Sequence, residues 1–273
     1  MTYGRQGSTP NRKSHGSQHK PVLLISMTTT TKIEWTEQTW SPTTGCTKVS
    51  PGCKHCYAEV MAKRLQAMGI NGYDNGFDLS ILPERLVEPL NRWKPTMYFV
   101  NSMSDLFHNE IPFEFLDQVF DVICRTPQHT YQILTKRAGR MRKYFASGGR
   151  FVPDNVWLGV SVEDRKYGLP RIDQLRKIES PIRFLSVEPL LEDLAQIDLA
   201  GIHWVIVGGE SGPKARPMKH EWVESIKEQC EEHGVAFFFK QWGGWGADGK
   251  KRSKKDNGRV LAGKTWDQMP ASI

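Results

Sequence analysis

Short apolar runs alternate with longer amphipathic stretches along most of this chain. Each run is about five residues long and rich in β-branched and aromatic residues, which is typical of strands buried on both faces of a parallel sheet. The runs are Met97–Asn101, Tyr131–Thr135, Val156–Ser161, Ile182–Val187, Trp204–Gly208 and Ala236–Lys240. Ile33–Trp35 alternates between apolar and polar residues and predicts one more short strand before them.

Apolar residues recur at helical spacing between these runs. Phe113–Arg125 is the clearest case, because its apolar side chains lie along one face of a helix. The other predicted helices are Tyr57–Met68, Glu84–Trp93, Lys136–Phe145, Arg171–Ile178, Leu190–Leu194 and Glu221–His233. About seven strands with helical segments between them indicate an α/β fold of parallel βα units. A partial TIM barrel of six βα units with one extra strand suits this count, and a doubly wound open sheet is the alternative.

A barrel of parallel strands places the carboxyl ends of all strands on one face, where active sites lie. Polar residues follow the predicted strands at these ends. They are Asn101, Ser102 and Asp105; Thr135, Lys136 and Arg137; Ser161 and Glu163; Ser186 and Glu188; Gly208, Gly209, Glu210 and Ser211; and Lys240, Gln241 and Trp242. The sequence therefore predicts a polar catalytic rim at this end of the barrel.

Three of the five cysteines lie within eleven residues, at Cys46, Cys53 and Cys56. Nearby Pro and Gly residues predict a loop. Thiolates are soft ligands that select zinc, copper(I) or iron–sulfur clusters. A closed zinc site needs four ligands, so zinc would require a histidine such as His55 or His108 as well. An iron–sulfur cube held by only three thiolates leaves one iron free for a small molecule.

The other two cysteines, Cys124 and Cys230, fall inside apolar helical patterns. We expect them to be small buried hydrophobic residues rather than ligands. The odd cysteine count and the Cys-x2-Cys spacing favour a metal or redox role over disulfides.

The stretch Gly-Cys-Lys-His-Cys-Tyr-Ala-Glu at residues 52–59 resembles the second half of the cluster motif of radical S-adenosylmethionine (radical SAM) enzymes, especially their spore photoproduct lyase-like branch. In that branch the last two cysteines are also two residues apart, and a Tyr-Ala pair often follows. The first gap differs, because six residues separate Cys46 from Cys53 where the family usually has three. From Ile33 onward the chain also resembles a phage-associated family of three-cysteine proteins.

The resemblance implies a 4Fe–4S cluster on Cys46, Cys53 and Cys56, with S-adenosyl-L-methionine bound through its amino and carboxylate groups. It further implies reductive cleavage of that cofactor and hydrogen abstraction from a substrate. An electron donor such as a flavodoxin or a ferredoxin would then be a partner. No residue is assigned a catalytic role.

Roles for single residues follow from the resemblance and from the rim. His55 lies where the family has an aromatic residue close to the adenine. Gly208-Gly209-Glu210 resembles the segment that binds the methionine amino group, although it follows about the sixth strand instead of the second. Ser161 and Glu188 suit ribose hydroxyl groups. The predicted cofactor-binding residues are His55, Tyr57, Asn101, Lys136, Ser161, Glu188, Gly208, Gly209 and Glu210.

Two alternatives concern charged residues of the same rim. Arg137 and Lys240, like Lys136, are suited to neutralise the methionine carboxylate or a substrate phosphate. Glu163, Glu188 and Glu210 together would instead suit a hard cation such as magnesium.

Length and hydropathy narrow the class of protein. No apolar run in the 273 residues approaches the ~20 that a membrane helix needs. Pro21–Ile25 is too short for the apolar core of a secretory signal. We therefore expect a cytoplasmic protein with no membrane partner. The predicted organisation is a disordered or non-native extension at 1–31, a radical SAM-like βα barrel at 32–246 and a basic tail at 247–273.

The net charge of +7 lies at the two ends. Residues 1–32 contain five Lys/Arg and no acid, and residues 247–273 contain seven Lys/Arg and three Asp, which leaves −2 for residues 33–246. Basic ends of this kind are typical of solvated, disordered tails, and they also suit phosphate groups. Nucleic acid is accordingly one candidate substrate. The alternative function is a non-enzymatic zinc module that binds nucleic acid or a phage partner.

Overall fold

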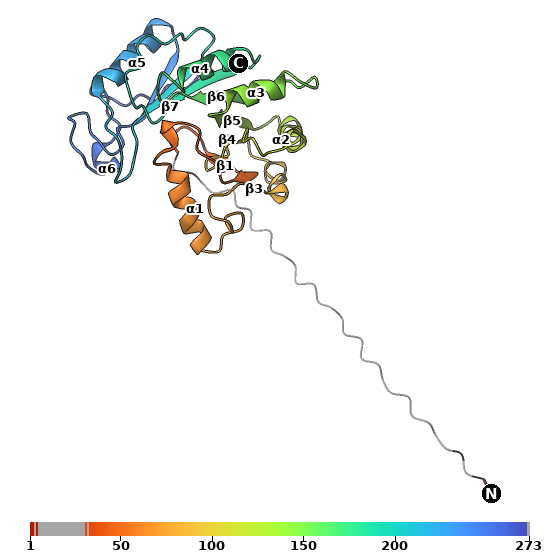
Figure 1. Ribbon diagram of the computed structural model, residues 1–273. Coiled ribbons are helices and arrows are strands. Elements are labelled where there is room, and N and C mark those ends of the chain that lie inside the picture. Colours follow the sequence, from red (N-terminus) through yellow and green to blue (C-terminus); the bar gives the residue numbers. More distant parts are fainter. Residues whose placement is uncertain (3, 5–30, 32, 272–273) are drawn as a thin grey trace.

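Seven parallel strands form one sheet that curls into a half-barrel, with helices on its convex face (Figure 1). The computed structural model describes residues 1–2, 4, 31 and 33–271. The strands of the sheet, in spatial order, are β1 (Gln38–Trp40), β4 (Met97–Val100), β5 (Thr130–Thr135), β6 (Val156–Ser161), β7 (Ile182–Val187), β8 (Trp204–Gly208) and β9 (Ala236–Gln241). Strands β2 (Thr43–Thr44) and β3 (Ser80–Ile81) form a separate antiparallel pair.

The strand order follows the chain without reversal, and this confirms the partial barrel. A doubly wound sheet changes direction at a switch point, whereas here each new strand is added next to the previous one. The α/β half-barrel predicted from the apolar runs is therefore the fold.

The strand predictions hold with one exception. All six runs from Met97 onward are strands whose ends differ from the prediction by at most one residue. The strand predicted at Ile33–Trp35 is wrong, because Glu34 and Trp35 lie in a turn and the first strand is β1. Trp35 instead packs its ring against Phe99 and Trp204, with centroids 4.7 and 5.9 Å away.

The helices are α1 (Tyr57–Ala67), α2 (Phe113–Arg125), α3 (Ala138–Phe145), α4 (Leu169–Arg176), α5 (His220–Glu232) and α6 (Lys254–Asn257). The helix predicted at Glu84–Trp93 is replaced by two 3₁₀ turns, Pro83–Arg85 and Pro89–Asn91. Proline lacks the N–H that would continue a helix.

The helix predicted at Leu190–Leu194 does not form. The backbone N–H of Leu190 donates to Gly208 and that of Leu191 donates to Glu163. This segment therefore bonds to residues at the ends of β6 and β8 instead of coiling on itself.

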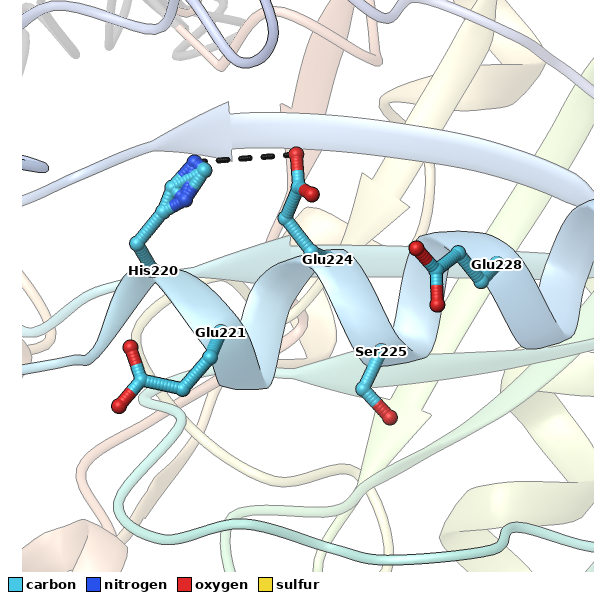
Figure 2. A pocket seen from close by; sticks show the side chains of 5 residues that line it. All are labelled: His220, Glu221, Glu224, Ser225 and Glu228. Atoms are coloured by element: carbon cyan, nitrogen blue, oxygen red, sulfur yellow. Dashed lines mark ion pairs between the residues drawn. The ribbon is translucent and has the colours of Figure 1, made fainter.

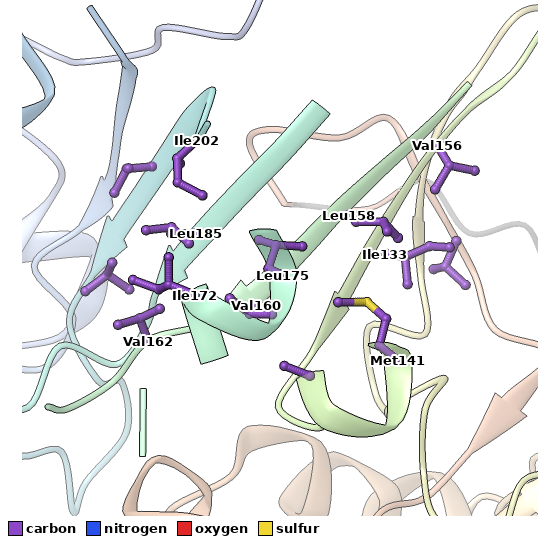
Figure 3. Packing of buried hydrophobic residues seen from close by; sticks show 14 of the residues in the cluster. Ile133, Met141, Val156, Leu158, Val160, Val162, Ile172, Leu175, Leu185 and Ile202 are labelled. Carbon is purple, nitrogen blue, oxygen red and sulfur yellow. The ribbon is translucent and has the colours of Figure 1, made fainter. Parts of the chain in front are cut away.

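The larger core lies between the convex face of the sheet and the helices. Figure 3 shows part of it, where Leu158, Val160 and Leu185 of the sheet face Met141 of α3 and Leu175 of α4. Alternate residues of each strand enter this core, as the two-residue period of a strand requires.

The remaining residues of each strand face the concave side, and their size and polarity change from the amino-terminal to the carboxyl-terminal end of the strand. The amino-terminal halves carry bulky side chains that pack as a second cluster. These are Trp157, Ile182, Phe184, Trp204, Ile206 and Phe238, with Trp35 and Phe99. The same faces end in small or polar residues: Ser161, Ser186, Gly208 and Lys240. The half-barrel is therefore filled at one end and hollow at the other.

The C-terminal segment is more ordered than expected. Leu261 and Trp266 are buried in the convex core, and the N–H of Phe239 in β9 donates to the carbonyl of Trp266 at 2.9 Å. Two apolar side chains thus anchor a stretch whose lysines predict a free tail. Almost all of the extension predicted at 1–31 lies outside the described residues, and the predicted domain boundaries stay predictions. Within the described residues, no helix has the length and apolar character needed to cross a bilayer.

Candidate active site

A cavity of about 860 Å³ occupies the hollow end of the half-barrel. Cys46, Cys53 and Cys56 all line it, and strand-end residues line it from other sides. The predicted cofactor-binding residues that border the cavity are His55, Tyr57, Asn101, Lys136, Ser161, Glu188, Gly209 and Glu210. Gly208 does not border it. The fold therefore brings together predicted metal-binding and cofactor-binding residues that are up to 164 positions apart in the sequence (Cys46 to Glu210).

The three thiols come from one loop, residues 45–56, which we call the cysteine loop. Cys46 follows β2, Cys53 ends the 3₁₀ turn Pro51–Cys53, and Cys56 is the residue that caps the start of α1. All three are half-buried. The positive end of the α1 dipole favours a thiolate or an anionic cluster next to Cys56.

Arg137, which follows β5, holds the first part of this loop. Its Nη1 donates to Cys46 Sγ at 3.5 Å and to Asp105 Oδ2 at 3.0 Å, and its Nη2 donates to the carbonyl of Thr47 at 3.0 Å. Asp105 is itself oriented by the Thr135 hydroxyl, which donates at 2.7 Å. Burial and the Asp105 carboxylate raise the pKa of the Cys46 thiol, and Arg137 partly opposes this.

Glu163, which follows β6, holds the middle of the loop. Its carboxylate accepts from Nη1 and Nη2 of Arg171, at 2.6 and 3.3 Å, and from the Ser50 hydroxyl. Burial by itself would raise the pKa of Glu163, but Lys136 and the bonds from Arg171 and Ser50 outweigh it and lower the pKa. A Cβ on Gly52 would lie 2.9 Å from Glu163 Cγ, so the loop can lie here only because residue 52 is glycine.

Glu210, which follows β8, contacts the loop directly at His55 and through Arg216 at Pro51. Arg216 donates to Glu210 through Nε at 2.9 Å and Nη2 at 2.6 Å, and its Nη1 donates to the carbonyl of Pro51 at 3.0 Å. His55 Nδ1 lies 3.2 Å from Glu210 Oε2. Burial would raise the pKa of Glu210, but the hydrogen bonds from Arg216 and His55 lower it.

Residues that follow strand β4 make two further contacts with the loop and with α1. Thr47 Oγ1 lies 2.8 Å from His108 Nε2, and the Tyr57 hydroxyl donates to the carbonyl of Ser102. The residues that follow β4, β5, β6 and β8 therefore all bind the cysteine loop or the first turn of α1. This keeps the three thiols against the cavity.

Other predicted site residues have structural partners as well. Asn101 adopts a φ of +58°, and its side-chain amide exchanges hydrogen bonds with Thr43. Glu188 Oε2 pairs with Lys240 Nζ at 3.2 Å inside the cavity. A Cβ on Gly208 would lie 2.3 Å from Glu188 Oε1, so this glycine allows the carboxylate to lie against β8. The cofactor roles of these residues stay predictions.

Two expectations need correction. Glu163 and Glu210 are each paired with an arginine, so they are unsuited to share a magnesium ion with Glu188. Cys230 is buried as expected, but Cys124 is exposed, because it lies on the outer side of the amphipathic helix α2.

Arg216 and Arg171 were not found from the sequence. Both lie in stretches without a recognisable motif, and each matters through the partners that it meets in the fold. The signal that the sequence does offer is their acidic partners, Glu210 and Glu163, which follow predicted strands at the rim.

A second hollow lies along α5 and is lined by His220, Glu221, Glu224, Ser225 and Glu228 (Figure 2). His220 Nε2 lies 3.7 Å from Glu224 Oε1. All five residues belong to one helix, and the side chain of His220 also stacks on Trp242. Side chains from a single exposed helix do not converge on a ligand, so the cavity at the cysteine loop is the candidate site.

Comparison with known proteins gives a family and a set of similar folds. The model of a family described as "Protein of unknown function (DUF5131)" matches residues 30–270. The fold is similar to a spore photoproduct lyase complexed with dinucleoside spore photoproduct, at 12% identity and a TM-score of 0.44, over 77% of this chain and 65% of that one. It is also similar to a double mutant of such a lyase with bound AdoMet and the dinucleoside, at 13% identity and a TM-score of 0.43, over the same shares.

The chain thus spans about two-thirds of the length of those lyase structures. The search of curated proteins found no match. None of these matches names a phage, so the expected phage association stays a prediction.

Proposed function

The chain belongs to the family described as "Protein of unknown function (DUF5131)", and we propose that it is an iron–sulfur enzyme that uses S-adenosyl-L-methionine. Cys46, Cys53 and Cys56 would hold a 4Fe–4S cluster, with S-adenosyl-L-methionine in the adjoining cavity. When bound and reduced, the cluster supplies the electron that cleaves the cofactor and starts radical chemistry on a substrate.

The observation that carries this proposal is the arrangement of three thiols on one wall of the cavity. They come from a loop that several strand ends hold in place, and within the loop no fourth cysteine completes a closed set. A cavity of about 860 Å³ is large enough for a nucleoside cofactor together with part of a substrate.

The zinc alternative needs a histidine as its fourth ligand. His108 has Nε2 2.8 Å from Thr47 Oγ1, and its Nδ1 accepts from the backbone N–H of Glu110 at 3.3 Å. Both of its ring nitrogens are engaged, which counts against His108 as a zinc ligand.

The residues opposite the thiols suit the parts of the cofactor. The Glu188–Lys240 pair offers both an acceptor and a donor to ribose hydroxyls or to the methionine end. Ser161 and Ser186 present hydroxyl groups from neighbouring strands. The aromatic cluster beneath them keeps water out of the other end of the half-barrel.

Anaerobic reconstitution with iron and sulfide tests the proposal. We expect close to four irons and four sulfides per chain, and 5′-deoxyadenosine after reduction by dithionite in the presence of S-adenosyl-L-methionine. A colourless protein that retains zinc would support the non-enzymatic module instead. A cluster that is reduced without cofactor cleavage would indicate an electron carrier.

Replacing Arg137 by Met should lower the reduction potential of the cluster while leaving it assembled. The change removes one positive charge and one N–H bond to Cys46 Sγ, and hydrogen bonds to cluster sulfur set the potential. A potentiometric titration followed by electron paramagnetic resonance measures the shift. Arg142→Met, at an exposed position of the neighbouring helix α3, is the matched control and should leave the potential unchanged. An unshifted Arg137→Met protein would show that this arginine only orders the loop.

Nucleic acid is the substrate class that the basic ends favour. Because Leu261 and Trp266 are core residues, deleting the C-terminal segment would damage the fold, and neutralising its exposed lysines is the better test. In wild type, binding of a labelled single-stranded oligonucleotide should fall with salt with a slope of about −0.7 per phosphate neutralised. Replacing Lys250, Lys254 and Lys255 by Gln should make this slope shallower. Unchanged binding would remove the support for a nucleic-acid substrate.

A further inference from the structure

The register of β9 against β8 shifts by one residue where β9 reaches the cavity. Phe239 pairs with Val207 of β8, and the next pair joins Gln241 to Gly208, which leaves Lys240 as an extra residue. Alternation along a strand would turn Gln241 toward the convex core, as it turns Phe239. Because of the bulge, Lys240 and Gln241 both border the cavity. A bulge thus re-aims the Gln241 side chain, as bulges next to active sites do.

The side-chain amide of Gln241 is held in one orientation. The residue is 7% exposed. Its Nε2 donates to Ser211 Oγ at 3.0 Å and to the Gly209 carbonyl at 3.3 Å, and the Gly209 N–H donates to the Gln241 carbonyl at 3.0 Å. The opposite orientation would place Oε1 against the Gly209 carbonyl, and two oxygen acceptors repel each other. The NH2 group therefore faces the loop that follows β8, and Oε1 faces away from it.

This arrangement leaves one acceptor and one donor beside the cavity. Within the described residues, Gln241 Oε1 receives no hydrogen bond. Ser211 Oγ accepts from Gln241, and its own proton remains available to a further acceptor. Both residues border the cavity. A buried acceptor without a donor is destabilising, so a ligand in the cavity that supplies an N–H would remove this penalty.

Gln241 lies at the open side of the half-barrel. It ends β9, which is one edge strand of the sheet, and β1 is the other. Glu34 before β1 and Lys254 after β9 also border the cavity, and their charged atoms lie 4.0 Å apart. The cavity therefore reaches the gap between the two edge strands. The cofactor must lie against the thiols, whereas a molecule in this gap lies next to the end of β9, so the free acceptor is placed for a substrate.

We propose that Gln241 and Ser211 select a substrate that carries an N–H next to a carbonyl group, which is the chemistry of an amide or of a lactam ring. The inference rests on the proposed function, because it takes the cavity as the place where a substrate meets the cofactor. Gln241 Oε1 accepts the substrate N–H, and Ser211 Oγ donates to the substrate carbonyl. A site built to bond a donor rejects an analogue that lacks it, because the buried acceptor is then left unpaired.

Binding of small probes to the full, reconstituted chain tests this pair, with S-adenosyl-L-methionine present and no reductant added. Uridine supplies a lactam N–H, N-acetylglycinamide supplies open-chain amides, and 3-methyluridine has a methyl group in place of the ring N–H. Saturation-transfer NMR measures the dissociation constants. Wild type should bind uridine or N-acetylglycinamide, and the one that it prefers identifies a lactam or an open-chain amide as the source. It should bind 3-methyluridine about tenfold more weakly than uridine, because the acceptor stays unpaired.

Variants of the pair separate its two members. Gln241→Met removes the acceptor at similar size, so it should weaken binding of the preferred probe by about tenfold and abolish the preference for uridine over 3-methyluridine. Ser211→Ala is a smaller change that leaves the Gln241 amide bonded to Gly209. It should weaken binding severalfold and keep the preference. Gln128→Met, at an exposed position before β5, is the matched control and should bind like wild type.

The outcomes separate this inference from the function on which it rests. A wild-type protein that binds neither uridine nor N-acetylglycinamide would refute the pair, as would unchanged binding of the preferred probe in both Gln241→Met and Ser211→Ala. Weaker binding of S-adenosyl-L-methionine alone in these variants would assign the pair to the cofactor and equally overturn the inference. The proposed function is judged separately, because 5′-deoxyadenosine formation after reduction needs neither probe, and its absence from wild type would refute that function.

Discussion

Replacing any one of Cys46, Cys53 and Cys56 by Ala should abolish the iron–sulfur chromophore and bring bound iron and sulfide to background. Three thiolates are the whole protein ligand set of the proposed cluster, so the loss of one leaves a second iron without a ligand. Visible absorbance and iron and sulfide analysis after anaerobic reconstitution measure the result. Cys124→Ala is the matched control, because that thiol is exposed on α2, and it should reconstitute like wild type.

Cys46→Ala is the most informative of the three variants. The six-residue gap to Cys53 departs from the spacing of the radical SAM motif, but Cys46 lines the same cavity and accepts a hydrogen bond from Arg137. A chromophore that survives in Cys46→Ala would exclude this cysteine from the ligand set. Thermal unfolding of each metal-free variant should resemble wild type, which separates ligand loss from misfolding.

Replacing Glu163 by Gln should destabilise the fold by about 3 kcal/mol or more, since breaking a buried ion pair leaves an uncompensated charge. The Glu163 side chain is fully buried against Arg171, and Gln keeps its size while removing its charge. For a chain of this length such a loss lowers the melting temperature by roughly 10 °C. The cysteine loop should loosen as well, because Glu163 also accepts from Ser50.

The effect of Glu163→Gln should depend on pH in a defined direction. The pKa of Glu163 lies below its ordinary value of 4.5, so the folded state holds the carboxylate more strongly than the unfolded chain does. Its stabilising contribution is complete above pH 4.5 and is lost as the pH falls through the folded pKa. The difference in unfolding free energy between wild type and variant, measured with urea, should therefore be constant near neutral pH and shrink as the pH falls below 4.5.

An exposed acid provides the control for this prediction. Glu232→Gln, at the end of α5, should change the unfolding free energy by less than about 0.5 kcal/mol. If Glu163→Gln is equally mild, the buried pair with Arg171 does not hold the loop, and the assignment of Glu163 as its anchor is wrong.

Much of the fold was predictable because its signals are local. A strand buried on both faces needs a continuous apolar run, and six such runs were recognised with nearly correct ends. The exception, Ile33–Trp35, shows the limit of a three-residue pattern. The position of β1 depends on pairing with Tyr98, Phe99 and Val100. These partners lie some sixty residues away, so the sequence of the short segment itself does not indicate where the strand begins.

The candidate site was predictable in composition and less so in detail. Parallel strands place their ends together, so Ser161, Glu188 and Glu210 were expected at one rim and do border one cavity. Their partners were not foreseen. Glu210 pairs with Arg216, and Arg137 donates to Cys46, because of the paths that the loops take across the rim. The spacing of these residues along the chain does not indicate those paths.

By itself, then, the sequence determined the βα succession and the cysteine spacing, because both are properties of neighbouring residues. The tertiary structure decided that the sheet stays open and hollow at one end. It also decided that buried arginine and carboxylate pairs tie the cysteine loop across that opening. The physical reason is that a buried charge must meet its counter-charge, and only folding determines which distant residue supplies it.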